Sequence, residues 1–147
     1  MEIIDIKDAL KAAKPQLKKL YDLLQEAEDS ITYESASADD LMHRSLFYQV
    51  KDKFESILPI VSGIDAPIIA RGRITKKSNG RYKINESHYL TCGSMIEVLI
   101  CDDFDDREKW VSTRVEHKNG DYYIVGYPNV PMQGLLARVR KYDSLFQ

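Results

Sequence analysis

The feature that most constrains the fold is a long heptad pattern of apolar residues in the first 31 positions. The stripe consists of Ile3, Ile6, Leu10, Ala13, Leu17, Leu20, Leu24, Ala27 and Ile31, at alternating intervals of 3 and 4. This spacing predicts an amphipathic helix whose apolar seam requires a partner. Asp5 is the predicted N-cap. Pro15 removes one backbone hydrogen bond, so we expect either a kink or two helices that meet there.

A second helix follows the small polar segment from Ser30 to Ser37. The sequence from Ser37 to Asp40 resembles a capping box, with Asp in place of Glu. Pro59 and Gly63 predict the end of this helix. Its stripe consists of Phe47, Val50, Phe54, Ile57 and Val61, widened by Met42, Leu46 and Leu58. Two helices of similar length joined by a short connection are typical of an antiparallel hairpin. A hairpin buries little by itself, so it must pack on the rest of the chain or on a second copy as a homodimer.

Charge is unevenly distributed along this hairpin. From Leu20 to His43 there are seven acids and no Lys or Arg, whereas the preceding part of the helix carries five lysines. Acids at the C-terminal end of a helix oppose its dipole, so helix stability does not explain them. They form either a solvated tip that keeps the protein soluble or a docking surface for a basic protein partner. The candidate partner-binding acids are Glu26, Asp29, Asp39 and Asp40.

Residues 66 to 147 predict short antiparallel strands joined by Asn-Gly turns. The candidate strands are Ile68 to Lys76, Arg81 to Asn85, Met95 to Cys101, Trp110 to His117, Tyr122 to Tyr127 and Leu135 to Arg140. In the first hairpin, a three-residue loop with left-handed Gly80 pairs Lys77 with Arg81. In the second, a two-residue Asn-Gly loop pairs Val115 with Ile124.

The predicted fold class is α+β, with an N-terminal antiparallel helical hairpin (1–64) and a small SH3-like antiparallel β-barrel (65–147). Six short strands in about 80 residues are too few for a large sandwich, and a closed barrel hides its strand edges. An OB-like barrel is the competing fold, although it usually needs longer and more curved strands.

Several stretches of the β half resemble an uncharacterised family, a domain of unknown function found in Gram-positive bacteria and their mobile elements. The stretches are Gly80 to Ile84, Leu90 to Leu99, Trp110 to Glu116, Asp121 to Gly126 and Gly134 to Arg140. The resemblance covers roughly Ile74 to Arg140 and concerns turns and strand residues, so it implies a fold and brings no catalytic residue. A mobile-element setting would also fit an inhibitor of a host defence protein, with the acidic tip imitating nucleic acid.

Two further surfaces of the β half are candidate binding sites. Arg73, Lys77, Arg81 and Lys83 form a predicted basic face that could bind nucleic acid. Residues 65–147 carry 13 basic and 11 acidic residues, which is a weak positive balance for a dedicated nucleic-acid binder. The predicted aromatic face of Trp110, Tyr123 and Tyr127 either packs against the helices or forms a groove for a peptide.

The sequence contains no recognisable arrangement for catalysis, metal binding or a cofactor. His43, His88 and His117 belong to no catalytic motif, and the acidic loop of residues 102–108 lacks calcium-loop spacing. Cys92 and Cys101 flank a predicted strand, which places them too far apart for a disulfide; we expect reduced, mostly buried thiols. No apolar run is long enough to cross a membrane, and the N-terminus does not resemble a signal peptide.

The sequence therefore predicts a cytoplasmic, non-enzymatic protein-interaction module with no cofactor. Its composition, with 44% apolar and 30% charged residues and a net charge of -2, is that of a globular protein. Nucleic-acid binding through the first β-hairpin and inhibition of a host protein are the alternatives.

Overall fold

The computed structural model describes residues 1–101, 104 and 106–142, and it has an α+β fold. The described chain divides into two compact units. The helical unit comprises Met1–Ala66 together with Tyr142, and the β unit comprises Pro67–Lys141.

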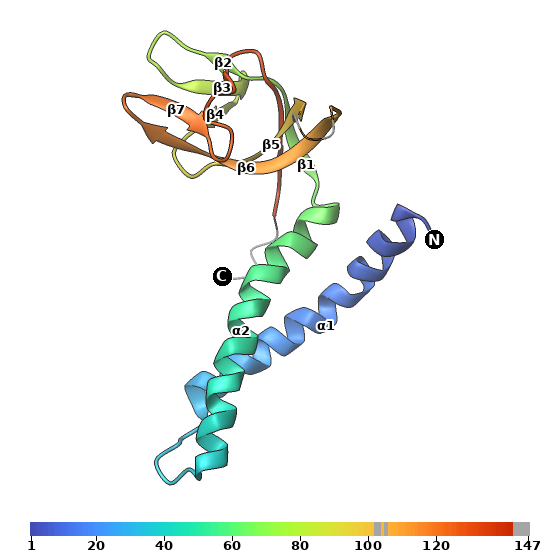
Figure 1. Ribbon diagram of the computed structural model, residues 1–147, viewed down its shortest axis with the longest axis vertical. Helices are drawn as coiled ribbons and strands as arrows, with labels where there is room; N and C mark the ends of the chain where they lie inside the picture. The colour runs from blue at the N-terminus through green and yellow to red at the C-terminus, as the bar shows by residue number, and fades with distance from the viewer. Residues whose placement is uncertain (102–103, 105, 143–147) are drawn as a thin grey trace. The chain divides into compact units, whose positions relative to one another are not determined.

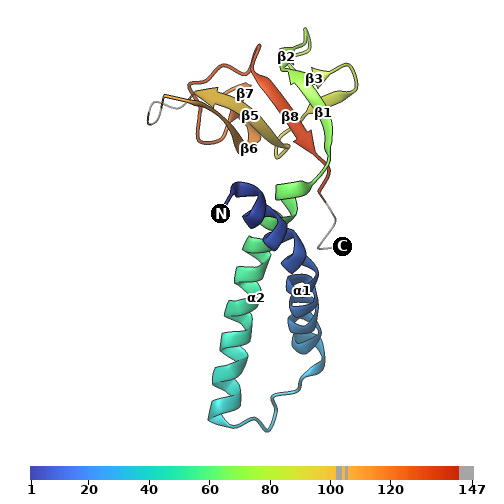
Figure 2. The ribbon, with the colours of Figure 1, turned by 90° about the vertical axis from the view of Figure 1, so that its right-hand side faces the viewer.

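The helical unit is a hairpin of two long helices, α1 (Ile3–Ser30) and α2 (Ala38–Asp65), which run antiparallel (Figures 1 and 2). Helix α1 continues through Pro15, so the alternative of two helices meeting there is wrong. The N-cap of α1 is Glu2 and not Asp5 as predicted. Asp5 lies one turn later, and its carboxylate accepts a hydrogen bond of 2.6 Å from the Glu2 amide. An acidic side chain here stabilises the first turn, although it does not begin the helix.

The capping box of α2 is confirmed. Ser37 Oγ accepts a hydrogen bond of 3.1 Å from the Asp40 amide, and the Asp40 carboxylate accepts one of 3.3 Å from the Ser37 amide. The predicted end of α2 is wrong, because the helix continues through Pro59 and Gly63 to Asp65. A Cβ atom on Gly63 would lie 3.2 Å from the ring of Tyr142. Gly63 therefore allows this tyrosine to approach the helix and does not mark its end.

The hairpin has a small hydrophobic core. Tyr21 of α1 and Leu58 of α2 are buried, and Leu17 and Phe54 pack against them. In Figure 1 the N-terminal part of α1 diverges from α2. Apolar residues of the heptad stripe in this part, such as Ile3, are consequently exposed.

The described residues of the β unit form eight strands in two antiparallel sheets (Figure 1). The strands are β1 (Ile68–Arg73), β2 (Thr75–Lys76), β3 (Tyr82–Asn85), β4 (His88–Leu90), β5 (Met95–Cys101), β6 (Glu108–Lys118), β7 (Asp121–Ile124) and β8 (Leu136–Arg140). The larger sheet has the order β1-β8-β5-β6-β7, and the smaller sheet has the order β2-β3-β4. The described strands do not close into a barrel, so the SH3-like barrel is not confirmed.

Both predicted hairpin registers are confirmed. Lys77 and Arg81 are joined by a backbone hydrogen bond of 2.7 Å around a loop in which Gly80 has a φ of 83°. Val115 pairs with Ile124 across the Asn-Gly turn. The first predicted strand is divided at Ile74, because β1 pairs with β8 whereas β2 pairs with β3. Strand β4 was not predicted; it forms the second edge of the small sheet.

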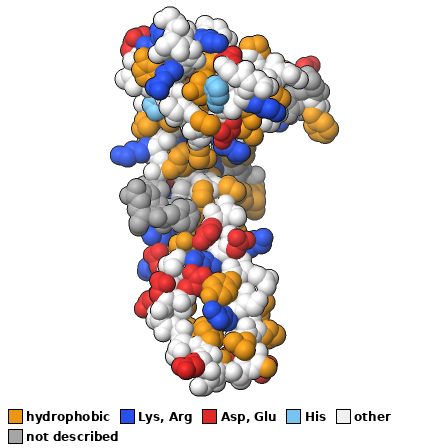
Figure 3. Space-filling model, turned by 90° about the vertical axis from the view of Figure 1, so that its left-hand side faces the viewer, with side chains coloured by type: hydrophobic (Ala, Val, Ile, Leu, Met, Phe, Trp, Pro, Cys, Tyr) orange, Lys and Arg blue, Asp and Glu red, His pale blue; other side chains and the backbone are white. Residues whose placement is uncertain are grey.

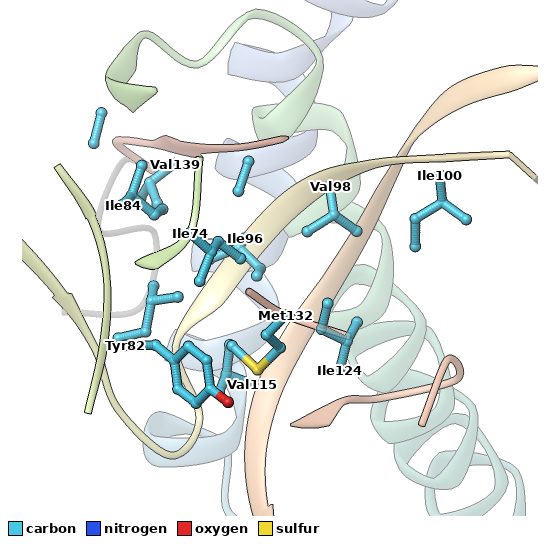
Figure 4. Close-up of a cluster of buried hydrophobic side chains, with 13 residues drawn as sticks. Ile74, Tyr82, Ile84, Ile96, Val98, Ile100, Val115, Ile124, Met132 and Val139 are labelled. Atoms are coloured by element: carbon cyan, nitrogen blue, oxygen red, sulfur yellow. The ribbon is translucent and has the colours of Figure 1, made fainter. Parts of the chain in front are cut away.

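The core of the β unit lies between the sheets (Figure 4). It consists of Ala70, Ile74, Tyr82, Ile84, Leu90, Ile96, Val98, Ile100, Val115, Ile124, Met132, Ala137 and Val139. Gly72 allows β1 to pass close to β3, since a Cβ atom there would lie 2.8 Å from the Ile84 carbonyl oxygen. This core fixes the inward positions of β5 and β8, so alternate residues of both strands lie on the outer face of the larger sheet.

Candidate interaction surfaces

One side of helix α2 carries a row of exposed apolar side chains. It consists of Met42, Leu46, Val50, Ile57 and Ile60, with exposed fractions between 44% and 70%. Their spacing places them on one stripe of the helix, roughly a quarter turn from Phe54 and Leu58, which face α1. Helix α2 therefore has two apolar sides, and the hairpin itself covers only one of them.

Helix α1 continues this exposed surface. Leu20 is exposed and lies on the flank of α1 that carries Ala13 and Ala27 but no lysine, and the exposed Ile31 is the C-cap residue just beyond the helix. Because two antiparallel right-handed helices wind in opposite senses when viewed from one end, this flank and the exposed row of α2 lie on the same side of the hairpin. We call this surface the apolar face; it consists of Leu20, Met42, Leu46, Val50, Ile57 and Ile60. Figure 3 shows hydrophobic side chains at the surface of the helical unit beside acidic ones.

The predicted acidic residues lie near the turn between the helices, and they have different surroundings. Glu26, Asp29 and Asp39 are exposed, and Asp29 accepts a hydrogen bond of 3.5 Å from Gln25. The Asp40 carboxylate accepts a hydrogen bond from the Ser37 amide in the capping box. Of these four acids, three are therefore available for a partner with little consequence for the helix.

Cations from elsewhere in the hairpin compensate part of this acidity. Lys51 of α2 forms an ion pair with Glu28 of α1, and the hydrogen bond that Lys51 donates to the Glu28 carboxylate raises the pKa of Lys51 above its ordinary value. Lys18 lies 3.3 Å from Asp22. The acidic segment lacks lysine in sequence, but folding brings one to it from the opposite helix.

An arginine that the sequence analysis did not single out fixes the turn of the hairpin. The Arg44 guanidinium lies 4.8 Å from the ring centre of Tyr33 and 5.6 Å from that of Tyr48, and it donates a hydrogen bond of 3.3 Å to the Tyr48 hydroxyl. His43 stacks on Phe47 at 6.3 Å between ring centres. These two residues and Tyr33 help to line an open groove of about 510 Å³. The turn is thus an ordered part of the hairpin surface.

The predicted basic residues do not form one exposed face. Arg73 is exposed, and its Nη1 donates a hydrogen bond of 2.9 Å to the Gly134 carbonyl. Lys83 is 7% exposed and donates to Glu86 at 2.9 Å, a hydrogen bond that raises the pKa of Lys83. Lys77 and Arg81 flank the turn of the first β-hairpin.

The predicted aromatic residues are also separated. Trp110 lies on the outer face of the larger sheet, where the guanidinium of Arg138 is 4.0 Å from its ring centre. Tyr123 pairs with Glu116, which lies six positions after Trp110 on β6. At ~3.3 Å per residue, Trp110 and Glu116 are ~20 Å apart along the strand. Tyr127 packs against the core of the β unit. The three residues therefore do not form one groove.

A buried ion-pair cluster on the outer face of the larger sheet was missed. Glu97 of β5 is 9% exposed and accepts hydrogen bonds from Arg138 Nε at 2.6 Å and Arg140 Nε at 2.5 Å. Burial raises the pKa of Glu97, but the hydrogen bonds from the two arginines outweigh it and leave the pKa below its ordinary value. The available signal was a single Glu in an apolar strand together with two arginines at alternate positions of the last strand.

Both thiols are free and exposed, so the expectation of mostly buried cysteines is wrong. Cys92 Sγ donates a hydrogen bond of 2.7 Å to the Glu116 carboxylate, and this raises the pKa of Cys92 above its ordinary value. A protonated thiol is a poor nucleophile. This pair therefore does not have the electrostatics of a catalytic cysteine.

No group of His, Cys, Asp and Glu among the described residues could hold a metal ion. Within the same part of the chain, neither helix combines the length and hydropathy needed to span a membrane. Residues 102, 103 and 105 of the acidic loop lie outside the described residues.

Residues 72–139 match the model of a domain of unknown function (DUF5348). The match lies within the β unit and leaves out both helices. The chain matches no curated protein and no solved structure.

Proposed function

We propose that the chain is a non-enzymatic protein-interaction module that binds its partner through the apolar face of the helical hairpin. The observation that carries the proposal is the exposed row on α2, whose members keep about half of their surface in contact with water. Large contiguous apolar patches on soluble proteins mark interaction sites.

The size of the apolar face supports this function. From Met42 to Ile60 the row is ~27 Å long at 1.5 Å per residue, and two helices side by side are ~20 Å wide. The face therefore covers at most about 500 Å², within the ~300–600 Å² of the largest apolar patch on a typical monomer, and such a patch is often functional. A stable protein interface buries ~800 Å² per partner, so the face could supply most of one.

The acidic residues supplement the apolar face. Glu26, Asp29 and Asp39 are exposed near the turn that joins the helices. Charges at the margin of an interface affect the association rate and partner choice more than affinity. A protein surface with an apolar centre and an exposed cation at its margin would complement this arrangement, and a mobile-element inhibitor of a host protein would be one instance of such binding.

Nucleic-acid binding through the first β-hairpin has less support. Lys83 is buried and paired with Glu86, and Arg73 is bonded to the Gly134 carbonyl. A dedicated binder would be expected to present its cations to phosphates as one exposed face. The experiment on the proposed function therefore compares recovery of the partner with and without nuclease.

The test is recovery of a tagged full-length chain from cells that naturally express it, with and without nuclease. The variant Leu46→Glu places a charge in the apolar face, and Leu41→Glu is the matched control because Leu41 is similarly exposed on another side of α2. We expect a nuclease-resistant protein partner to be lost with Leu46→Glu and retained with Leu41→Glu. Loss of all binding after nuclease treatment, or equal recovery with both variants, would contradict the proposal.

A further inference from the structure

We propose that the partner of the apolar face is a second copy of this chain, which packs α2 antiparallel against α2 about a two-fold axis at Leu46. The inference rests on the function proposed above and names its partner. It follows from a symmetry in the exposed row of α2.

The spacing of this row is palindromic around Leu46. Asp39 and Lys53 lie on the same stripe as the apolar residues, and the order Asp39, Met42, Leu46, Val50, Lys53 has intervals of 3, 4, 4 and 3. Intervals of 3 and 4 keep side chains on one side of a helix. In an antiparallel pair centred on Leu46, facing residues have numbers that sum to 92. Met42 then faces Val50 of the second copy, and Leu46 faces itself.

The same symmetry brings opposite charges together. Asp39 is exposed in the first turn of α2, and the Lys53 side chain is 77% exposed, with Nζ 3.8 Å from Asp52. An antiparallel second copy places Asp39 opposite Lys53 of the other chain at both ends of the contact. A parallel copy would instead place each charge opposite its own kind. Charge complementarity therefore selects the antiparallel orientation.

The start of α2 at Ala38 limits the length of this antiparallel contact. The positions that would face Ile57 and Ile60 by the same sum precede Ala38, so these two residues lie beyond the α2–α2 contact, which spans ~21 Å from Asp39 to Lys53. The α1 helices would lie on either side of the central α2 pair, which gives a four-helix arrangement. At ~21 Å by ~20 Å the contact covers about 400 Å² per copy, and a total of ~800 Å² is that of a weak interface, so we expect dissociation in the micromolar range.

Sedimentation equilibrium of the purified full-length chain tests this inference. We expect a dimer of twice the 16.9 kDa monomer at ~100 µM, which exceeds a micromolar dissociation constant. Leu46→Glu should give a monomer, because two carboxylates would meet at the axis, and Leu41→Glu should remain dimeric. Asp39→Lys and Lys53→Asp alone should each weaken association about tenfold, since each change loses two ion pairs per dimer. The double variant should recover the wild-type value.

A second measurement reports the orientation directly. With Cys92 and Cys101 replaced by Ser, Leu46→Cys should form an intermolecular disulfide with itself under mild oxidation, whereas Leu41→Cys should not. A monomer at all concentrations, a dimer that tolerates Leu46→Glu, or a double charge variant that stays weak would each overturn the inference. If the purified chain is monomeric but a different protein is still recovered in a Leu46-dependent manner, the second-copy inference fails and the proposed function stands. If the purified chain is monomeric and no protein is recovered in a Leu46-dependent manner, both proposals are refuted.

Discussion

Replacing Glu97 with Gln should strongly destabilise the β unit. The substitution preserves the shape of the side chain but removes the carboxylate that accepts hydrogen bonds from Arg138 and Arg140, whose side chains are 17% and 16% exposed. Removing one member of a buried ion pair typically costs 3–5 kcal/mol, because the remaining charge stays buried without compensation. The arginines retain some contact with water, so we expect a loss of about 3 kcal/mol, at the low end of that range.

This loss should be easy to measure. For a domain of 60–100 residues, 1 kcal/mol shifts Tm by roughly 4–8 °C, so the variant should melt at least 10 °C lower. Trp110 is the only tryptophan and lies on the same face of the sheet, so its emission follows unfolding of this unit. Glu108→Gln is the control, because Glu108 is an exposed residue at the end of β6.

The pH dependence provides an independent check. The folded structure lowers the pKa of Glu97 below its ordinary value of 4.5, so the unfolded chain binds this proton more tightly. Stability from Glu97 is fully present above pH 4.5 and is lost as the pH falls through the lowered value. The difference in unfolding free energy between wild type and Glu97→Gln should therefore shrink below pH 4.5. A variant within 1 kcal/mol of wild type at pH 7, or a difference that does not depend on pH, would refute this reasoning.

Three other substitutions test local parts of the structure. Ser37→Ala should cost about 1 kcal/mol by removing the N-cap of α2, measured as a lower midpoint in urea melts followed by helix ellipticity; an unchanged midpoint would contradict the capping role. Gly72→Ala should cost about 1–3 kcal/mol, because its Cβ would clash with the Ile84 carbonyl; a thermal melt equal to wild type would show that the strands can separate without cost. Glu116→Gln should lower the pKa of Cys92 and speed its alkylation several-fold at pH 8 in a variant without the other cysteine; an unchanged rate would exclude Glu116 as the cause.

Local features of the fold were predictable because neighbouring residues determine them. The Asn119-Gly120 turn fixes the register of β6 and β7, and Ser37 with Asp40 fixes the start of α2. The strand from Met95 to Cys101 was predicted with its observed bounds. In each case a short sequence pattern strongly favours one conformation of low free energy.

Features that depend on distant contacts were not predictable in the same way. Gly63 resembles a helix end in sequence, but Tyr142 packs against it and the helix continues. The division of the first strand at Ile74 arises because β1 and β2 pair with different strands. The missed cluster around Glu97 needs arginines some forty residues away.

The candidate surface was only partly visible in the sequence. The heptad stripes predicted apolar sides of both helices, but spacing alone does not show how much the hairpin covers. The exposure of Leu46, Val50 and Ile57 depends on how the two helices cross and on the small core around Tyr21 and Leu58. The predicted acids are exposed but include one, Asp40, that the capping box uses.

Site-specific photo-cross-linking in cells that naturally express the protein tests the central claim most directly. A benzophenone amino acid placed at Leu46 should give a protein adduct on irradiation, because the account places this position inside an interface. The same group at Leu41, which is similarly exposed on another side of α2, should give none. Equal cross-linking at both positions, or adducts from position 41 alone, would contradict the claim that the apolar face is the binding surface.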